Sequence, residues 1–282
     1  MVVIVNRQSL LGTASDCVLL LWFLLRQKRV WLYFHNQSWR RYARYPLALV
    51  RWLGGDSLRM LVLTSEIAKR LRDAGFDSRV LNNSGGEAFD ALAARSGPPG
   101  ARRLVWIGRP DKSKGFTFAL EVFAALRSSE SGWWFDIYGT EGKGHDQPPG
   151  VFYHGFVQGP EKMRAYLNGG VFILPSSYVN ETQPLAIIEA LAAGLPVVAS
   201  TAGGIKEMLR AGEKMAGYAI PEQSIAEYVH AINSCIAHYK ECSSAAKVVY
   251  RQRFSHRGFC HAVATEFAID SLSTDDRQSW GD

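Results

Sequence analysis

Two glutamates, Glu181 and Glu189, are separated by seven residues where a polar loop meets a predicted helix. The helix starts at Pro184, so that Glu181 precedes it and Glu189 lies about a turn and a half inside it. A helix N-terminus has free N–H groups and partial positive charge, which suit a phosphate, and a nearby carboxylate suits sugar hydroxyls. The simpler alternative is a first-turn helix charge and a solvated surface residue.

Two cations, Arg109 and Lys114, follow a predicted strand at Arg102 to Gly108. A guanidinium and an ammonium can together stabilise a pyrophosphate, whose negative charge grows as a sugar–phosphate bond breaks. The alternative is that both side chains lie on a solvated loop. The pattern indicates a phosphate-binding turn if the rest of the chain supplies a matching site.

The glutamates belong to a succession of strand, loop, helix and strand. The apolar run Val171 to Leu174 is followed by a polar loop, by a helix that Gly194 ends, and by a second apolar run at Val197 to Ala199. This order is that of a βαβ unit in a parallel sheet. In an open sheet of this kind ligands bind beyond the carboxyl ends of the strands, where both charged loops are expected to lie.

The same alternation of strands and helices extends along the chain, which predicts an α/β fold. In the first part, strands are predicted at Val2 to Val5, Val30 to Phe34, Leu58 to Leu63 and Arg79 to Asn83, and helices at Leu10 to Leu25 and Ser65 to Ala74, with Ser65 as N-cap. The stretch Glu87 to Gly100, which ends in glycine and proline, is the predicted linker. Later strands are predicted at Trp133 to Tyr138, Val151 to Phe156 and Gly217 to Ile220, and later helices at Phe116 to Arg127, Pro160 to Leu167, Ser224 to Tyr239, Ser243 to Phe254 and Arg257 to Leu272.

Several ordered motifs of the second half resemble one family. They are Pro175 to Ser177, the pair Glu181 and Glu189, the run Glu189 to Ser200, and Gly203 to Glu207. Together they resemble the donor-binding domain of retaining GT-B glycosyltransferases of the glycosyltransferase family 4 type. The resemblance implies a GT-B-like α/β fold, in which two Rossmann-like parallel-sheet domains face a cleft.

The resemblance also implies a division of the chain. It places a shortened N-terminal acceptor-side α/β domain at 1–95, a nucleotide-sugar donor-binding domain at 96–255, and at 256–282 a C-terminal helix that crosses back to the first domain, followed by a tail. Members of the family usually begin with a strand and a glycine-rich turn several elements upstream of the counterpart of Val2. The N-terminal domain is therefore expected to be contracted or truncated.

The resemblance assigns a role to each charged residue. Arg109 and Lys114 hold the diphosphate, Glu181 contacts hydroxyls of the donor sugar, and Glu189 binds the ribose. The implied catalytic residues are Glu181, His35, Arg109 and Lys114, and the implied donor-binding residues are Gly108, Arg109, Lys114, Gly139, Glu181, Thr182, Gln183, Pro184, Leu185 and Glu189. No metal or other cofactor is expected, because the two cations replace the ion and the sequence has no His/Cys cluster with ligand spacing.

Two positions carry open questions. The family's loop has an aromatic–glycine pair where this chain has Gln183 and Pro184. Because Pro184 cannot donate an N–H, one phosphate contact is expected to be lost or moved. His35 ends a predicted strand that faces the cleft, and a contact with the donor sugar and a structural role are both open. His154 is expected to pack or hydrogen-bond rather than to catalyse.

The composition bounds the class of protein. The chain has 282 residues, of which 47% are hydrophobic and 21% charged, with a formal charge of +6, as in an ordinary globular protein. Nucleic acid is not an expected partner, because no recognised motif or long basic stripe accompanies the charge. The scattered Cys17, Cys235, Cys242 and Cys260 indicate packed thiols in a reducing compartment. No secretory signal is evident, and the predicted location is the cytoplasm.

The segment Trp39 to Leu53 combines aromatic residues with four arginines. One interpretation is a membrane-surface segment, whose arginines meet lipid phosphates and whose use would be access to a lipid-linked acceptor. The protein would then be peripheral on the inner face of the cell membrane. The other interpretation is a helix with an apolar core face and a solvated basic face, interrupted at Pro46.

The function predicted from these features is transfer of a sugar from a nucleoside-diphosphate sugar to an acceptor hydroxyl of a glycan or lipid-linked glycan, with retention of anomeric configuration. Two alternatives remain open. A non-catalytic glycosyltransferase-like subunit would bind a sugar nucleotide or a partner protein without transferring a sugar. A GT-B-type sugar-nucleotide epimerase would use the same two-domain architecture.

Overall fold

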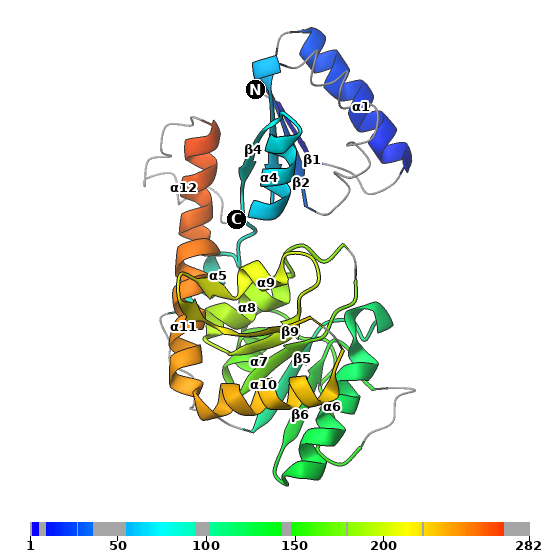
Figure 1. Ribbon diagram of the computed structural model, residues 1–282, viewed down its shortest axis with the longest axis vertical. Coiled ribbons are helices and arrows are strands. Elements are labelled where there is room, and N and C mark those ends of the chain that lie inside the picture. The colour runs from blue at the N-terminus through cyan, green and yellow to red at the C-terminus, as the bar shows by residue number, and fades with distance from the viewer. Residues whose placement is uncertain are drawn as a thin grey trace.

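The computed structural model describes residues 2–5, 10–26, 28–35, 55–93, 102–142, 148–178, 180–221 and 223–267. Figure 1 shows two α/β domains along the long axis of the molecule, with helices α11 (Tyr239–Arg253) and α12 (His256–Phe267) running along one side. The basic aromatic segment Trp39 to Leu53, the glycine- and proline-rich end of the predicted linker and the C-terminal tail lie outside the described residues.

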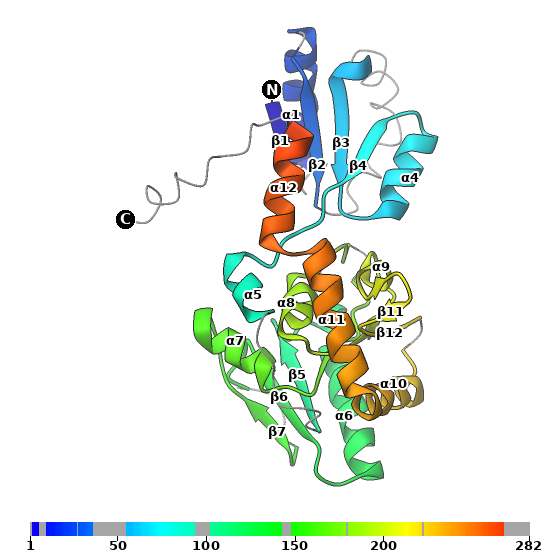
Figure 2. The same cartoon turned by 90° about the vertical axis from the view of Figure 1, so that its left-hand side faces the viewer.

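The first domain contains a parallel sheet in the order β1-β2-β3-β4. Its elements are β1 (Val2–Val5), α1 (Leu10–Leu25), β2 (Val30–Phe34), the short helix η1 (Gly55–Ser57), β3 (Leu58–Val62), α4 (Ser65–Asp73) and β4 (Asp77–Val80). Because side chains alternate across a strand, one face of the sheet packs against α1 and α4, and the other face packs against α12. Figure 2 shows α12 lying against this sheet.

The fourth strand differs from its predicted position, which was Arg79 to Asn83. It spans Asp77–Val80, and its buried residue is Ser78, whose hydroxyl donates to the carbonyl of Ala68 at 2.6 Å. Val80 is 38% exposed. This strand has no alternation of apolar and polar residues, because its one buried residue is a serine. The sequence pattern therefore predicts the strand too far along the chain.

The N-cap of α4 is Thr64 and not Ser65 as predicted. The Thr64 hydroxyl accepts from the N–H of Ile67 at 3.3 Å, as a capping side chain does. The hydroxyl of Ser65 instead donates to a carboxylate oxygen of Glu207 in the second domain, at 2.7 Å. The Ser65 hydroxyl therefore forms a contact between domains and does not cap its own helix.

The second domain contains a parallel sheet in the order β12-β9-β8-β5-β6-β7. Its strands are β5 (Arg103–Ile107), β6 (Trp134–Tyr138), β7 (Val151–Tyr153), β8 (Val171–Leu174), β9 (Val197–Ser200) and β12 (Gly217–Ile220), and β10 (Arg210–Ala211) pairs with β11 (Lys214–Met215). Its helices are η2 (Lys112–Lys114), α6 (Phe116–Ser129), α7 (Gly159–Leu167), α8 (Leu185–Ala193), α9 (Ile205–Met208) and α10 (Ile225–Ala237). Strands β8 and β9 are fully buried, as continuous apolar runs in a covered parallel sheet should be.

Part of the predicted linker is a helix, α5 (Glu87–Leu92), whose Phe89 and Leu92 join the core of the second domain. Asp90 on this helix accepts from the hydroxyl of Tyr250 at 2.7 Å and from the N–H of His256 at 2.9 Å. The connection out of the first domain and the start of α12 are therefore tied together at α5.

Glu266, near the end of α12, fastens this helix to the first sheet. Its carboxylate accepts from Trp31 at 3.0 Å, from Arg59 at 2.7 Å and from Arg79 at 3.2 Å. The Glu266 side chain is only 9% exposed. Three donors on three strands thus hold the return helix across the face of the first domain.

Candidate functional site

The strand order of the second domain reverses between β5 and β8. From β5 the sheet extends through β6 to β7, and from β8 it extends in the other direction through β9 to β12. The loops leaving β5 and β8 at their carboxyl ends therefore flank a crevice, which is the usual ligand site of such sheets. These loops, 108–115 and 175–184, hold most of the residues predicted to form the site.

Glycines let the backbone of neighbouring loops approach closely at this edge. A β-carbon on Gly115, where φ is +79°, would lie 2.0 Å from the carbonyl oxygen of Pro175. A β-carbon on Gly139, which follows β6, would lie 2.4 Å from the carbonyl oxygen of Gly108. Both positions therefore require glycine, and their contacts are with protein backbone.

Lys114 and Glu181 meet between the two loops. The Lys114 ammonium lies 3.7 Å from Oε2 of Glu181, and the hydroxyl of Ser176 donates to the same oxygen at 3.3 Å. The Lys114 side chain is 40% exposed and that of Glu181 only 9%. The pair thus joins a buried carboxylate to a cation that still reaches solvent, where an anionic ligand can compete for it.

The turn after β9 fixes the backbone beside Glu181. A β-carbon on Gly203, where φ is +55°, would lie 1.6 Å from the carbonyl oxygen of Glu181, and one on Gly204 would lie 2.3 Å from that of Thr182. The N–H of Gly204 donates to the Glu181 carbonyl at 3.3 Å. The two consecutive glycines therefore let the turn after β9 pack directly against the backbone of Glu181 and Thr182.

The first turn of α8 and the side chain of Arg109 supply polar groups that could contact a ligand. Pro184 is the N-cap of α8 and makes no side-chain capping bond. Its carbonyl accepts from the N–H of Ile187 at 3.1 Å, so the N–H groups of Leu185 and Ala186 are the ones that precede the first hydrogen bonds of the helix. Leu185 at the start of the helix is 53% exposed. Arg109 is exposed, and no described carboxylate forms an ion pair with it.

Glu189 is buried and held from α7. Lys162 donates to Oε1 at 2.6 Å and the hydroxyl of Tyr166 donates to Oε2 at 2.7 Å. Burial, reinforced by the negative charge of Glu189, raises the pKa of Tyr166 well above its ordinary value, so this hydroxyl keeps its proton. Each carboxylate oxygen has a second acceptor direction, through which Glu189 can still take a ligand hydroxyl.

The Gln183 side chain points to the first domain. Its amide nitrogen donates to the carbonyl of Leu63 at 2.5 Å and to Oδ1 of Asn82 at 2.8 Å, and its oxygen accepts from the N–H of Asn83 at 2.8 Å. The Asn83 side chain donates in return to the Gln183 carbonyl at 3.2 Å. Gln183 thus forms a hydrogen-bonded clamp between the two domains.

His35 follows β2 at its carboxyl end, facing the second domain. Its ring centre lies 4.1 Å from that of Tyr33. Partial burial lowers the pKa of His35, and a hydrogen bond with the Asn83 side chain acts in the opposite direction. Through Asn83, His35 is connected to Gln183 and hence to the start of α8.

His154 has a hydrogen-bonding role, as expected. Its Nε2 lies 2.7 Å from Oδ1 of Asp136, and its ring stacks on Tyr138 with 4.5 Å between centres. Arg103 lies 3.2 Å from the other oxygen of Asp136. These contacts fasten β7 to β6 at the edge of the sheet.

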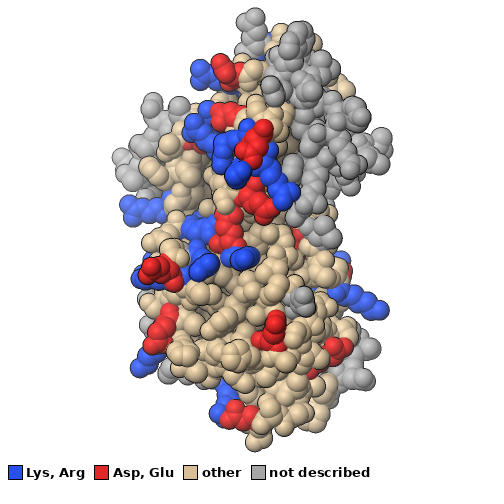
Figure 3. Space-filling view, in the orientation of Figure 1, with Lys and Arg blue, Asp and Glu red and all other residues tan. Residues whose placement is uncertain are grey.

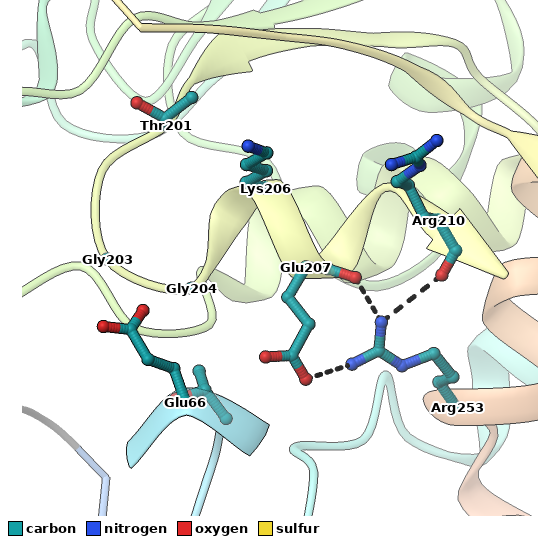
Figure 4. Close-up of a pocket in the computed structure, with 9 residues that line it drawn as sticks. Glu66, Thr201, Gly203, Gly204, Lys206, Glu207, Arg210 and Arg253 are labelled. Atoms are coloured by element: carbon teal, nitrogen blue, oxygen red, sulfur yellow. Dashed lines mark hydrogen bonds and ion pairs between the residues drawn. The ribbon is translucent and has the colours of Figure 1, made fainter. Parts of the chain in front are cut away.

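A cavity of about 450 Å³ lies where the two domains meet. Its lining residues, seen in Figure 4, are Thr64, Glu66, Thr201, Gly203, Gly204, Lys206, Glu207, Arg210 and Arg253. Figure 3 shows charged side chains of both signs gathered over the first domain and this junction. None of the residues assigned to the site from the sequence lines this cavity.

Glu207 bridges the domains at the wall of this cavity. Its carboxylate accepts from the N–H of Ser65 at 3.0 Å and from Arg253 at 3.0 Å, and Arg253 also donates to the Glu207 carbonyl. A carboxylate at the N-terminus of α4 is favoured by the helix dipole. Glu207 and Gln183 are therefore two separate hydrogen-bonded connections between the domains.

The structure thus divides the predicted site residues into groups. Gly108, Lys114, Gly139, Glu181 and Thr182 lie together at the reversal of strand order, with Arg109 on the same loop. Glu189 is held by α7, and Gln183 faces the first domain. Sequence reasoning missed the partners Lys162, Tyr166 and Asn83, because each contact joins segments with no local signal between them.

Two kinds of feature are absent from the described residues. Among them, no group of three or more His, Cys, Asp or Glu side chains is arranged to hold a metal ion. Nor does that part of the chain contain a helix with both the length and the apolar character needed to cross a membrane.

Solved structures of known proteins share this fold. The structure is similar to Alr3699/HepE of Anabaena in complex with UDP, with a TM-score of 0.69 and 17% identity over 94% of this chain and 78% of that one. It is also similar to sucrose-phosphate synthase of Thermosynechococcus elongatus, with a TM-score of 0.61 and 17% identity over 87% and 69% of the two chains. The molecule has the GT-B glycosyltransferase fold, as predicted.

Part of the sequence matches known glycosyltransferases. Residues 101–238 match the family model described as "Glycosyl transferases group 1". Among curated proteins, sulfoquinovosyl transferase SQD2 of Arabidopsis thaliana is 32% identical over 50% of this chain and 27% of its own length. Glycogen synthase of Mycobacterium tuberculosis is 24% identical over 80% of this chain and 56% of its own length. The chain thus spans between about a quarter and somewhat over half of these relatives.

Proposed function

We propose that this protein is a retaining glycosyltransferase of the family 4 type, which transfers a hexose from a nucleoside-diphosphate sugar to an acceptor hydroxyl. The observation that carries this is the meeting of Lys114 and Glu181 at the reversal of strand order, beside an α8 N-terminus without a side-chain cap. The group 1 family match of residues 101–238 supports it.

The diphosphate of the donor would lie between the two loops. Lys114 and the exposed Arg109 supply positive charge on one side, and the first N–H groups of α8 supply it on the other. Pro184 contributes no N–H and its carbonyl accepts from Ile187, so the helix offers the N–H groups of Leu185 and Ala186. Solved structures of similar fold carry UDP, including Alr3699/HepE and the pneumococcal O-GlcNAc transferase GtfA.

The two glutamates would bind the sugar parts of the donor. Glu181 lies beside Lys114, so its carboxylate is placed to accept from hydroxyls of the transferred sugar. Glu189 lies just over one turn inside α8 and is oriented by Lys162 and Tyr166, which fits an acceptor of the ribose hydroxyls. A carboxylate fixed by two donors loses little further freedom when a ligand hydroxyl binds it.

The reaction can then proceed on one face of the sugar. The acceptor oxygen bonds to the anomeric carbon as the bond from that carbon to the phosphate oxygen breaks, and the departing phosphate takes the acceptor proton. Negative charge accumulates on the phosphate, where Arg109, Lys114 and the α8 N-terminus stabilise it. These fixed groups replace a metal ion in the proposal. His35 would contact the donor sugar from the first domain.

The acceptor in this proposal is a glycan or lipid-linked glycan, bound by the first domain in the cytoplasm at the inner face of the membrane. The expected membrane contact through Trp39 to Leu53 stays a prediction, since that segment lies outside the described residues.

The proposal is tested with a thermal-shift screen of UDP-, GDP-, ADP- and dTDP-sugars, because a ligand that binds the folded state raises the unfolding midpoint. The donor so found is then incubated with acceptors and membranes, and product stereochemistry is determined. Absence of any shift would contradict the proposal. Donor binding without glycosylation of any acceptor would favour the non-catalytic subunit, and an epimerised sugar nucleotide would favour the epimerase.

A further inference from the structure

Helix α1 carries a group of exposed apolar side chains. Within eight residues, Val18 is 66% exposed, Leu19 41%, Trp22 47% and Leu25 73%. Leu20 and Leu24, which alternate with them, are buried against the sheet and α4. At about 100° per residue the exposed side chains share one side of the helix and the buried pair the other. Figure 1 shows α1 on the outside of the first domain, across the sheet from α12.

Positive charge flanks this apolar face. The Arg26 guanidinium lies 4.6 Å from the ring centre of Trp22, and Lys28 and Arg29 are exposed. In the described part of the chain no carboxylate forms an ion pair with any of these three cations. The sequence from 17 to 55 contains seven Lys or Arg and no Asp or Glu. The apolar face and its cations are therefore not neutralised by acidic residues of the same segment.

This combination selects one kind of partner. Contiguous exposed apolar side chains on a soluble domain indicate an interaction surface. A second copy of the chain, packed about a two-fold axis, would bring the same cations against each other. An anionic lipid bilayer supplies both an apolar layer for the leucines and valine and phosphates for the cations. With 16 residues, α1 is also too short to cross a bilayer, whose core needs about 20.

We infer that α1 docks flat on an anionic membrane surface. Val18, Trp22 and Leu25 enter the boundary between headgroups and acyl chains, where a tryptophan ring is well accommodated. Arg26, Lys28 and Arg29 contact the lipid phosphates. The inference does not depend on sugar transfer, because lipid binding is measured without donor or acceptor.

The test is co-sedimentation of the full chain with vesicles of phosphatidylcholine, with and without phosphatidylglycerol. The wild type is expected to bind the anionic vesicles, and to bind them less as the salt concentration rises. Leu25→Glu removes an apolar side chain and adds a repelled charge, so it should lower the partition coefficient by about tenfold or more. Trp22→Glu should act in the same direction.

Two matched variants serve as controls. Trp134 of β6 is 43% exposed and Phe156 is 80% exposed, and both lie in the second domain. Trp134→Glu and Phe156→Glu introduce the same change without touching α1, and they should leave vesicle binding within about twofold of the wild type. Circular dichroism and the unfolding midpoint confirm that each variant is folded.

Three results would overturn the inference. One is a wild-type protein that does not bind anionic vesicles, and another is binding that Leu25→Glu leaves unchanged while the variant remains folded. The third is dimerisation of the wild type in analytical ultracentrifugation that Leu25→Glu abolishes, since a second copy would then occupy the face. Loss of binding in the α1 variants alone, with both controls retained, is the result expected.

Discussion

Replacing Gln183 by leucine should loosen the contact between the two domains. The substitution keeps a side chain of similar size and removes the bonds to Leu63, Asn82 and Asn83. Gln183 is only 6% exposed, so these partners do not regain water while the domains stay closed. The Leu63 carbonyl and the Asn83 N–H would both lose their hydrogen-bond partner. Each buried polar group without a partner destabilises the closed arrangement by about 1–3 kcal/mol.

Taking about 2–3 kcal/mol for the pair, the ratio of closed to open protein should fall by roughly 30- to 150-fold. The assays are small-angle scattering, which should show a larger radius of gyration, and amide exchange of Asn83, which should speed up. Gln223→Leu is the matched control, because Gln223 is exposed and its described hydrogen bond, 3.4 Å to Pro175, lies within the second domain. An unchanged radius and unchanged Asn83 exchange in Gln183→Leu would refute the clamp.

Three further predictions follow from the structure. Gly203→Ala should displace the Glu181 loop and weaken donor binding. Its control is Gly212→Ala, where φ is +61° and an added β-carbon has no atom within 4 Å, so this variant should cost only about 1 kcal/mol of stability. Equal losses of stability and of donor affinity for the two variants in calorimetry would contradict the packing argument. Glu189→Ala should lower the unfolding free energy by about 1–3 kcal/mol, because Lys162 and Tyr166 lose a buried partner, and Glu189→Gln should lower it less. Glu189→Ala should also abolish the donor-induced thermal shift, and an undiminished shift would reject the ribose role. For His35, burial lowers the pKa below the ordinary 6.5, so its contribution to stability is complete above pH 6.5 and is lost as the pH falls through the lowered value. In urea unfolding between about pH 7.5 and 5, the unfolding free energy of the wild type should therefore decline more steeply than that of His35→Gln. Parallel curves for the two proteins would contradict this prediction.

Much of the fold is predictable because the buried strands are locally marked. Val171–Leu174 and Val197–Ser200 are buried along their whole length, and continuous apolar runs bounded by Pro175 and Pro196 are strong signals. β4 is the counterexample. Its inward residue is Ser78, whose burial is made acceptable by a hydrogen bond to α4, and no pattern of hydrophobicity reveals that.

The position of a site residue is predictable where it lies on one of the loops that the strand order brings together. Lys114 and Glu181 come from the two loops that the strand order brings together, so their meeting follows from topology. The orientation of Gln183 does not, because its partners lie 100 or more residues away in the chain. Such a contact depends on how two domains dock, which local sequence does not encode.

The most direct test of the account is calorimetric titration of the wild type and of Lys114→Ala with the nucleoside diphosphate of the preferred donor. If the loops after β5 and β8 hold the diphosphate, Lys114→Ala should weaken binding by about 10- to 100-fold, the value of one or two charge-assisted hydrogen bonds. Lys112→Ala, an exposed cation in the same turn, should leave the affinity nearly unchanged. Equal affinity of the wild type and Lys114→Ala would contradict the claim that this crevice grips the diphosphate.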